Sequence, residues 1–158
     1  MERLVSSLTK NESTDEGKTQ KLLDFVTEEL KYDYSDANSN AEVLKRPNEV
    51  LMAGGSDCSG KVILYASLLE QTDVDYRLVY INGHITVAVE GNYGNRNGLS
   101  FNIGDTTYSI AETTAKGFQT GRSRLSRNLE IEDIKYIQRP GKDSKIYDAK
   151  TGKPLPFL

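Results

Sequence analysis

The sequence is poor in the residues from which several kinds of site are built. It contains one cysteine, Cys58, one histidine, His84, and no tryptophan among its 158 residues. A single cysteine excludes an intramolecular disulfide framework. One cysteine and one histidine also leave a zinc site of ordinary composition short of ligands, so we expect no metal site.

An excess of one charge and long apolar runs are lacking as well. Lys and Arg number 20 and Asp and Glu number 23, for a net charge of −3, which gives no electrostatic reason to expect a nucleic-acid partner. There is no apolar run of about 18 residues and no signal peptide, so we expect no transmembrane segment and a chain that is soluble as given. Its compartment and oligomeric state stay open, and a domain cut from a longer exported protein would look the same.

The rest of the composition is that of an ordinary globular domain. Hydrophobic residues make up 37% and charged residues 27% of the chain, as in typical soluble proteins. A chain of 158 residues suits a single domain and buries about 70% of the surface that its unfolded form exposes. We expect one domain over residues 1–158, with its core at about 14–139 and a C-terminal tail at 140–158.

Hydrophobic periodicity predicts helices in the first half of the chain and strands in the second. Apolar residues at helical spacing predict a helix over about 14–31, Pro47 begins a short helix, and a helix that is apolar nearly all round begins near Cys58. The predicted strands are 76–81, 84–90, 107–112 and 134–138, with a short additional strand possible at 99–103. This order predicts an α+β fold in which an antiparallel sheet packs on a central helix.

The position of Cys58 is the most informative feature. Ser56 or Asp57 can cap the predicted helix, which places Cys58 in its first turn. The thiolate is the reactive form of cysteine, and the positive end of a helix dipole favours it. The alternatives are that Cys58 is a small buried apolar residue and that Asp57 is a helix cap rather than a catalytic acid.

His84 begins a strand, so its ring can project from the sheet toward the start of the Cys58 helix and form a thiolate–imidazolium pair. A third residue should orient the ring. If the strands at 84–90 and 107–112 pair about Gly98, then Glu112 lies opposite His84, with Cβ atoms about 5 Å apart. Asp105 is the alternative acid, although this pairing puts it about 23 Å away. Structural roles for His84 and Glu112 also stay open.

Several segments around these residues resemble the transglutaminase-like superfamily, over about residues 20–118. The lead-in found in prokaryotic members is similar to YDY at 32–34 and RPNEVL at 46–51. The family's Gly-Asp-Cys helix is similar to GSDCSG at 55–60, followed by ASLL at 66–69. The next strand is similar to YRLV at 76–79, the Gly-His segment to GH at 83–84, and the third element to TYSIAETT at 107–114.

The resemblance implies a papain-like, transglutaminase-like core and a Cys–His–acid triad of Cys58, His84 and Glu112. Glu112 stands where the family usually has Asp, and the segment between His84 and Glu112 is longer than usual. The tryptophan that assists protein-crosslinking members is missing, which favours hydrolysis. Tyr32 and Tyr34 are candidates to donate a hydroxyl to the oxyanion, with core packing of their rings as the alternative.

We therefore predict cysteine-dependent acyl transfer without a cofactor, most simply hydrolysis of an amide, peptide or isopeptide bond. The expected partner is a peptide or protein substrate, whose identity the sequence leaves open. Two alternatives remain. One is a catalytically inactive protein-interaction module that keeps the fold, and the other is a transglutaminase that joins glutamine to an amine.

Overall fold

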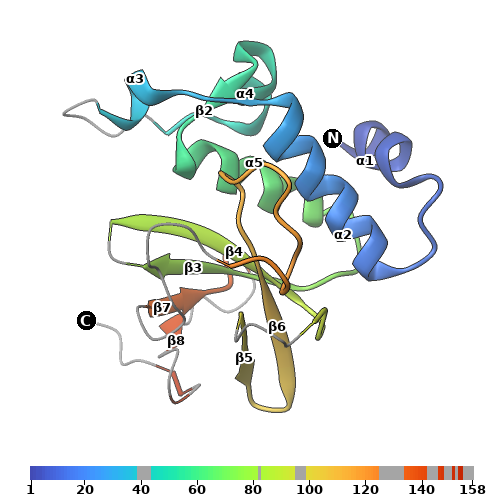
Figure 1. Cartoon of the computed structure of the whole chain (residues 1–158), viewed down its shortest axis with the longest axis vertical. Coiled ribbons are helices and arrows are strands. Elements are labelled where there is room, and N and C mark those ends of the chain that lie inside the picture. The colour runs from blue at the N-terminus through green and yellow to red at the C-terminus, as the bar shows by residue number, and fades with distance from the viewer. Residues whose placement is uncertain are drawn as a thin grey trace.

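The computed structural model describes residues 1–38, 44–81, 83–94, 99–124, 134–141, 146–147, 151 and 153–154. Within them, helices cover one side of a six-stranded sheet (Figure 1). Helix α5 (Cys58–Leu69) lies between the other helices and the sheet, where it contacts strands β3 and β4 (Tyr76–Ile81 and His84–Glu90). This arrangement confirms the predicted α+β fold with a central helix that carries Cys58.

Helix α5 is central because its residues are apolar around most of its circumference, so every side of it seeks cover. The predicted helix over 14–31 is α2, continued by the π-helical turn η1, and Pro47 begins α4 as predicted. Helix α1 was not predicted from the sequence, and its Val5 packs into the core. The bounds are α1 Glu2–Thr9, α2 Asp15–Asp24, η1 Phe25–Glu29, α3 Tyr34–Ala37 and α4 Pro47–Ala53.

The sheet has the strand order β5-β6-β4-β3-β7-β8, and each described neighbour pair is antiparallel. Strands β3, β4 and β7 (Ile134–Gln138) have the predicted bounds. The optional strand forms as β5 (Ser100–Ile103), the strand predicted at 107–112 is β6 (Thr106–Ala111), and β8 (Ile146–Tyr147) completes the edge. Alternation of buried side chains therefore located the strands to within about one residue.

The predicted pairing of β4 with β6 is wrong by two residues. Ala88 lies opposite Ile110, whereas a centre at Gly98 would have placed it opposite Tyr108. The offset arises because β5 forms a hairpin with β6, which changes how the chain returns from β4. Since side chains alternate with a period of two, an offset of two keeps every side chain on its predicted face. His84 and Glu112 therefore stay on the same face of the sheet.

No helix within the described residues is long and apolar enough to cross a membrane.

Candidate active site

The first turn of α5 positions Cys58. Asp57 is the N-cap, and its Oδ1 accepts hydrogen bonds from the Gly60 amide at 3.1 Å and the Ser59 hydroxyl at 2.9 Å. The Lys61 amide donates to the Asp57 carbonyl at 3.2 Å. Among the described residues, the amides of Cys58 and Ser59 have no protein acceptor, so they are available at the helix start. Asp57 is used as a cap, as the structural alternative predicted.

Close packing behind the helix start fixes its position. Strand β1 (Lys31–Tyr32) pairs in parallel with β2 (Gly55–Ser56), just before the cap. A Cβ on Gly55 would lie 2.5 Å from the Lys31 carbonyl oxygen, and one on Gly60 would lie 2.7 Å from the Ser56 Cβ. Only glycine fits at these two positions without displacing the backbone that carries Cys58.

A buried lysine anchors the same turn from the other side. Lys61 is 2% exposed, and its ammonium group donates to the carbonyls of Val26 at 3.1 Å and Leu30 at 2.7 Å. These carbonyls belong to the end of η1, so Lys61 supplies donors that the helix terminus lacks. Burial lowers the pKa of Lys61 to about 8, with a further contribution from Lys116, against the opposing charges of Glu28 and Glu112.

His84 is the first residue of β4, and Glu112 follows directly after β6, so the neighbouring strands bring the two side chains together. His84 Nε2 lies 2.7 Å from Glu112 Oε2, and the other carboxylate oxygen accepts from the Thr114 amide at 2.9 Å and hydroxyl at 2.7 Å. Burial alone would raise the pKa of Glu112, but these hydrogen bonds and the His84 charge outweigh it and lower the pKa. The Glu112 carboxylate is thus a fixed anion behind the imidazole.

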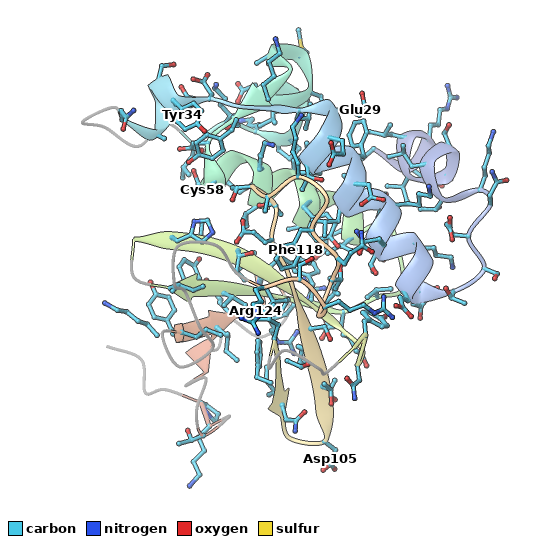
Figure 2. The ribbon with its side chains drawn as sticks, in the orientation of Figure 1. Glu29, Tyr34, Cys58, Asp105, Phe118 and Arg124 are labelled. Atoms are coloured by element: carbon cyan, nitrogen blue, oxygen red, sulfur yellow. The ribbon has the colours of Figure 1, made fainter. Side chains whose placement is uncertain are left out.

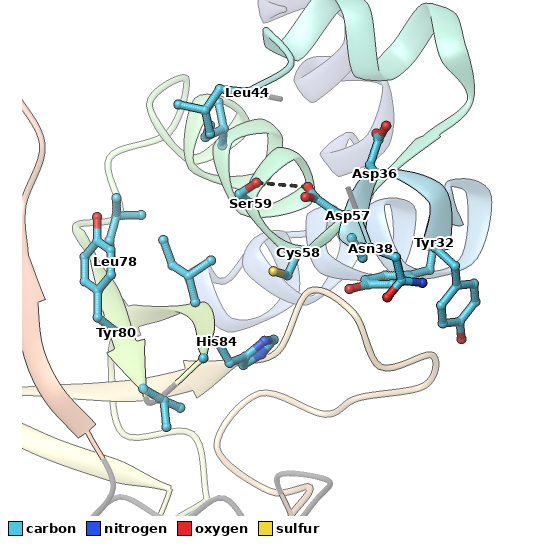
Figure 3. A pocket seen from close by; sticks show the side chains of 16 residues that line it. Tyr32, Asp36, Asn38, Leu44, Asp57, Cys58, Ser59, Leu78, Tyr80 and His84 are labelled. Carbon is cyan, nitrogen blue, oxygen red and sulfur yellow. Dashed lines mark hydrogen bonds between the residues drawn. The ribbon is translucent and has the colours of Figure 1, made fainter. Parts of the chain in front are cut away.

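His84 faces Cys58 on its other side. In Figure 3 the Cys58 sulfur and the His84 ring point toward one another across the middle of the pocket. Burial would lower the pKa of His84, but hydrogen bonds to Cys58 and Glu112 and their negative charges raise it to about 9. Since Nε2 is engaged by Glu112, Nδ1 is the ring atom available to the sulfur. The His84 ring is therefore protonated at neutral pH and lies beside the Cys58 sulfur.

The sulfur and the ring open into a cleft of about 840 Å³. Tyr32 and Tyr34 line it, and their rings meet edge to face with centroids 4.9 Å apart. The alternative that both rings pack in the core is wrong, since Tyr34 is 67% exposed and Tyr32 is half-buried at the cleft wall. Strand β1 holds Tyr32 beside Ser56, close to the start of α5.

Asp105 is not near this group. It lies exposed in the turn between β5 and β6, at the tip of the hairpin farthest from Cys58 in Figure 2. Of the two acids predicted from the sequence, it is Glu112 that contacts His84.

Sequence reasoning missed Lys61 and Thr114. A lysine inside an otherwise apolar helix was a signal for the first, and a Thr two residues after the predicted acid was a weak signal for the second. Within the described part of the chain, no cluster of three or more His, Cys, Asp or Glu side chains could hold a metal ion.

Comparison with known proteins gives a matching family and several similar solved structures. The family described as the transglutaminase-like superfamily matches residues 2–117. Among curated proteins, none matches the sequence.

Three solved structures of LapG from Legionella pneumophila are similar to this chain at low identity. The calcium-bound form is 13% identical with a TM-score of 0.48, over 95% of this chain and 88% of that one. A second LapG structure is 14% identical with a TM-score of 0.47, over 94% and 88%. The EGTA-treated form is 14% identical with a TM-score of 0.48, over 96% and 87%.

Proposed function

The chain belongs to the transglutaminase-like superfamily, and on that premise we propose that it is a thiol hydrolase that cleaves an amide bond in a peptide or protein. Cys58 is the nucleophile, His84 the general acid and base, and Glu112 the residue that orients His84. The observation that carries the proposal is the meeting of the Cys58 sulfur, the His84 ring and the Glu112 carboxylate at an open cleft.

Acylation begins with attack of the Cys58 thiolate on the substrate carbonyl carbon. The carbonyl oxygen becomes an oxyanion, which the amides of Cys58 and Ser59 can stabilise because they have no protein acceptor among the described residues. A donor of this kind contributes about 3–4 kcal/mol in comparable sites. Tyr32, held beside the helix start by β1, is the candidate for a further hydroxyl donor.

Collapse of the intermediate breaks the C–N bond. The His84 imidazolium gives its proton to the leaving nitrogen, so the amine departs neutral and the acyl group stays on Cys58 as a thioester. Neutral His84 then takes a proton from water, whose oxygen attacks the thioester. The C–S bond breaks, the acid product forms, and the thiolate–imidazolium pair returns.

Glu112 keeps the ring in the tautomer and orientation that this cycle needs. Its hydrogen bond to Nε2 at 2.7 Å leaves Nδ1 available to the sulfur, and Thr114 holds the carboxylate in turn. Glutamate suits this role because its side chain is longer than that of aspartate. The observed pairing places Glu112 two residues away from the position opposite His84, and the longer side chain spans that offset.

Hydrolysis of a proteome-derived peptide mixture, read by mass spectrometry, tests the proposal. We expect cleavage by the wild type and a loss of at least about 10³-fold in Cys58→Ala, because the nucleophile is gone. Ser67→Ala is the matched control, since Ser67 lies on the same helix and its hydroxyl donates to the Ile63 carbonyl at 2.8 Å. Equal cleavage by Cys58→Ala would rule out the cysteine mechanism.

A labelled primary amine added to the same reaction separates hydrolysis from crosslinking. We expect new carboxyl ends and no amine attached to glutamine, because water is the acceptor of the acyl group. Amine incorporation without new peptide ends would instead identify a transglutaminase.

A further inference from the structure

The two ends of the cleft differ in chemistry. Cys58 and His84 lie in its middle, with Leu44, Leu78 and Tyr80 toward one end and Tyr32, Asp36 and Asn38 toward the other (Figure 3). A substrate whose amide bond reaches the sulfur therefore extends into two unlike environments.

The apolar end is formed where the β3–β4 hairpin meets α5. Tyr80 lies opposite Ile85 and Leu78 opposite Val87, so the four side chains share one face of the sheet. Val87 is fully buried, whereas Leu78, Tyr80 and Ile85 are only half-buried where this face reaches the cleft. Leu78, Tyr80 and Ile85 thus line the same cleft as His84 without being fully covered by the fold.

The facing wall of this end is apolar too. Ile63, on α5, lines the cleft half-buried, and Leu44 lines it with 63% of its surface exposed. Large exposed hydrophobic residues are few in the described part of the chain, and two of them, Leu44 and Tyr34, border this cleft. Apolar surface that converges in a concave site is typical of a ligand-binding pocket.

The carboxylates that line the cleft are already paired. Asp57 accepts from Ser59 and Gly60, and Asp36 forms an ion pair with Lys45. The described residues at the apolar end include no acidic or basic side chain apart from His84. A charged substrate side chain would lose water there without gaining a partner, whereas an apolar one would gain by burial.

Resting on the proposed function, we propose that this end of the cleft is a subsite for a bulky aliphatic or aromatic side chain next to the amide bond that Cys58 attacks. The substrates are then peptides or unfolded protein segments with Leu, Ile, Met or Phe beside the cleaved bond. The cleft of about 840 Å³ lies in the range of about 300–1,000 Å³ that holds ligands of several residues.

The first test is the cleavage profile of a proteome-derived peptide library. We expect Leu, Ile, Met and Phe to be enriched at one position beside the cleaved bonds. For a matched pair of fluorogenic peptides with Leu or Ala there, kcat/KM should favour Leu by about tenfold or more. Cleavage without such a preference, or preferential cleavage of a muropeptide with small side chains, would overturn the subsite while the proposed hydrolase stands.

Variants locate the preference in the cleft. Leu44→Ser and Leu78→Thr should lower the Leu-to-Ala ratio of kcat/KM by about threefold to tenfold each, because each removes apolar contact. Leu44 is 63% exposed, so its replacement leaves folding intact. Met52→Ser is the matched control, since Met52 is 88% exposed and lies on α4 outside the cleft. An unchanged ratio in both cleft variants would remove the subsite from this surface.

A binding measurement separates this inference from the hydrolase itself. Fluorescein-labelled hexaglycine and its single Leu variant are titrated with the Cys58→Ala protein, and anisotropy is read. We expect the Leu peptide to bind about tenfold tighter. If it does while the wild type cleaves nothing, the subsite stands and the hydrolase fails. Equal binding of both peptides overturns the subsite.

Discussion

Two groups of paired ionised side chains lie on the same sheet, and they differ in whether the cation can lose its proton. At one end, His84 and Glu112 pair at 2.7 Å, with side chains 16% and 3% exposed. Near the start of β3, the 4%-exposed side chain of Arg139 bonds Asp75 at 2.7 Å and Glu70 at 2.6 Å. Asp75 lies just before β3, and His84 pairs with the last residue of that strand. The length of β3 therefore separates the two groups by about 20 Å.

The two groups differ in the chemistry of their cations, an arginine in one and a histidine in the other. Arg139 also stacks over the Tyr76 ring, 4.1 Å from its centroid, and ties the end of α5 to β3 and β7. A guanidinium stays protonated in proteins, so this group cannot transfer protons. An imidazole can, and His84 faces a sulfur and a cleft instead of further anions. Of these two cations, only His84 can exchange a proton.

The largest expected effect comes from Glu112→Gln. We expect kcat/KM to fall by about 10²–10⁴-fold, because an amide neither fixes the tautomer of His84 nor stabilises its imidazolium. The free energy of unfolding should change by only about 1 kcal/mol or less, since His84 can become neutral when its partner is lost. Steady-state kinetics and urea unfolding measure the two quantities.

Glu112→Asp is the control for this change. It keeps the charge but shortens the side chain, so we expect activity between those of the wild type and Glu112→Gln. Wild-type kcat/KM in Glu112→Gln would show that Glu112 is only a structural ion-pair partner.

Arg139→Met should show the opposite balance. The change leaves Asp75 and Glu70 without their shared cation, and we expect the free energy of unfolding to fall by about 2–3 kcal/mol, because both carboxylates keep some contact with water. Activity per folded molecule should stay near that of the wild type. Arg139→Lys keeps the charge without the planar donors and should lie between the two in urea unfolding. A large loss of kcat in well-folded Arg139→Met would break the distinction.

The pH dependence of the wild type sharpens the comparison. The pKa of His84 is raised to about 9, so the active imidazolium persists up to that pH, and kcat/KM should fall about tenfold per pH unit above it. In Glu112→Gln the alkaline limb should move to lower pH, since burial then lowers the pKa of His84 with less opposition. An alkaline limb that stays in place would mean that another group controls it.

The same pair makes stability depend on pH in a defined window. His84 has a raised pKa, so its contribution to the free energy of unfolding is complete below about 6.5 and is lost as the pH rises through about 9. Glu112 has a lowered pKa, so its contribution is present above about 4.3 and is lost as the pH falls through its folded-state value. The stability difference between wild type and Glu112→Gln should therefore be greatest at mildly acidic pH.

Much of this site could be predicted from the sequence because its parts are local. A capping residue, a cysteine and an apolar run define the start of α5 within a few residues, and alternation defines β3 and β4. The pairing of β4 with β6 could not be predicted, because it depends on the hairpin that β5 forms with β6. The prediction that His84 meets Glu112 survived since the error of two residues preserves the face.

The role of Lys61 could not be predicted for a different reason. Its acceptors are the carbonyls of Val26 and Leu30, which are free because α2 ends in a π-helical turn. That turn contacts α5, and no local sequence pattern shows where its acceptors will be.

Lys61→Met gives the smallest expected effect at neutral pH, and the size of this effect depends on pH. Loss of the ammonium leaves two carbonyls without their donor, so we expect the free energy of unfolding to fall by about 1–2 kcal/mol at neutral pH. The pKa of Lys61 is lowered to about 8 in the folded protein, so between that pH and about 10.4 the unfolded chain binds more protons.

The wild type therefore gains stability over this range through Lys61, a gain that Lys61→Met cannot make, and the deficit of the variant should widen from about pH 7 to about pH 10. Urea unfolding at both pH values measures it, with Lys18→Met as the control on a partly exposed lysine whose side chain is 36% accessible. A deficit that shrinks as the pH rises would mean that folding raises the pKa of Lys61 instead of lowering it.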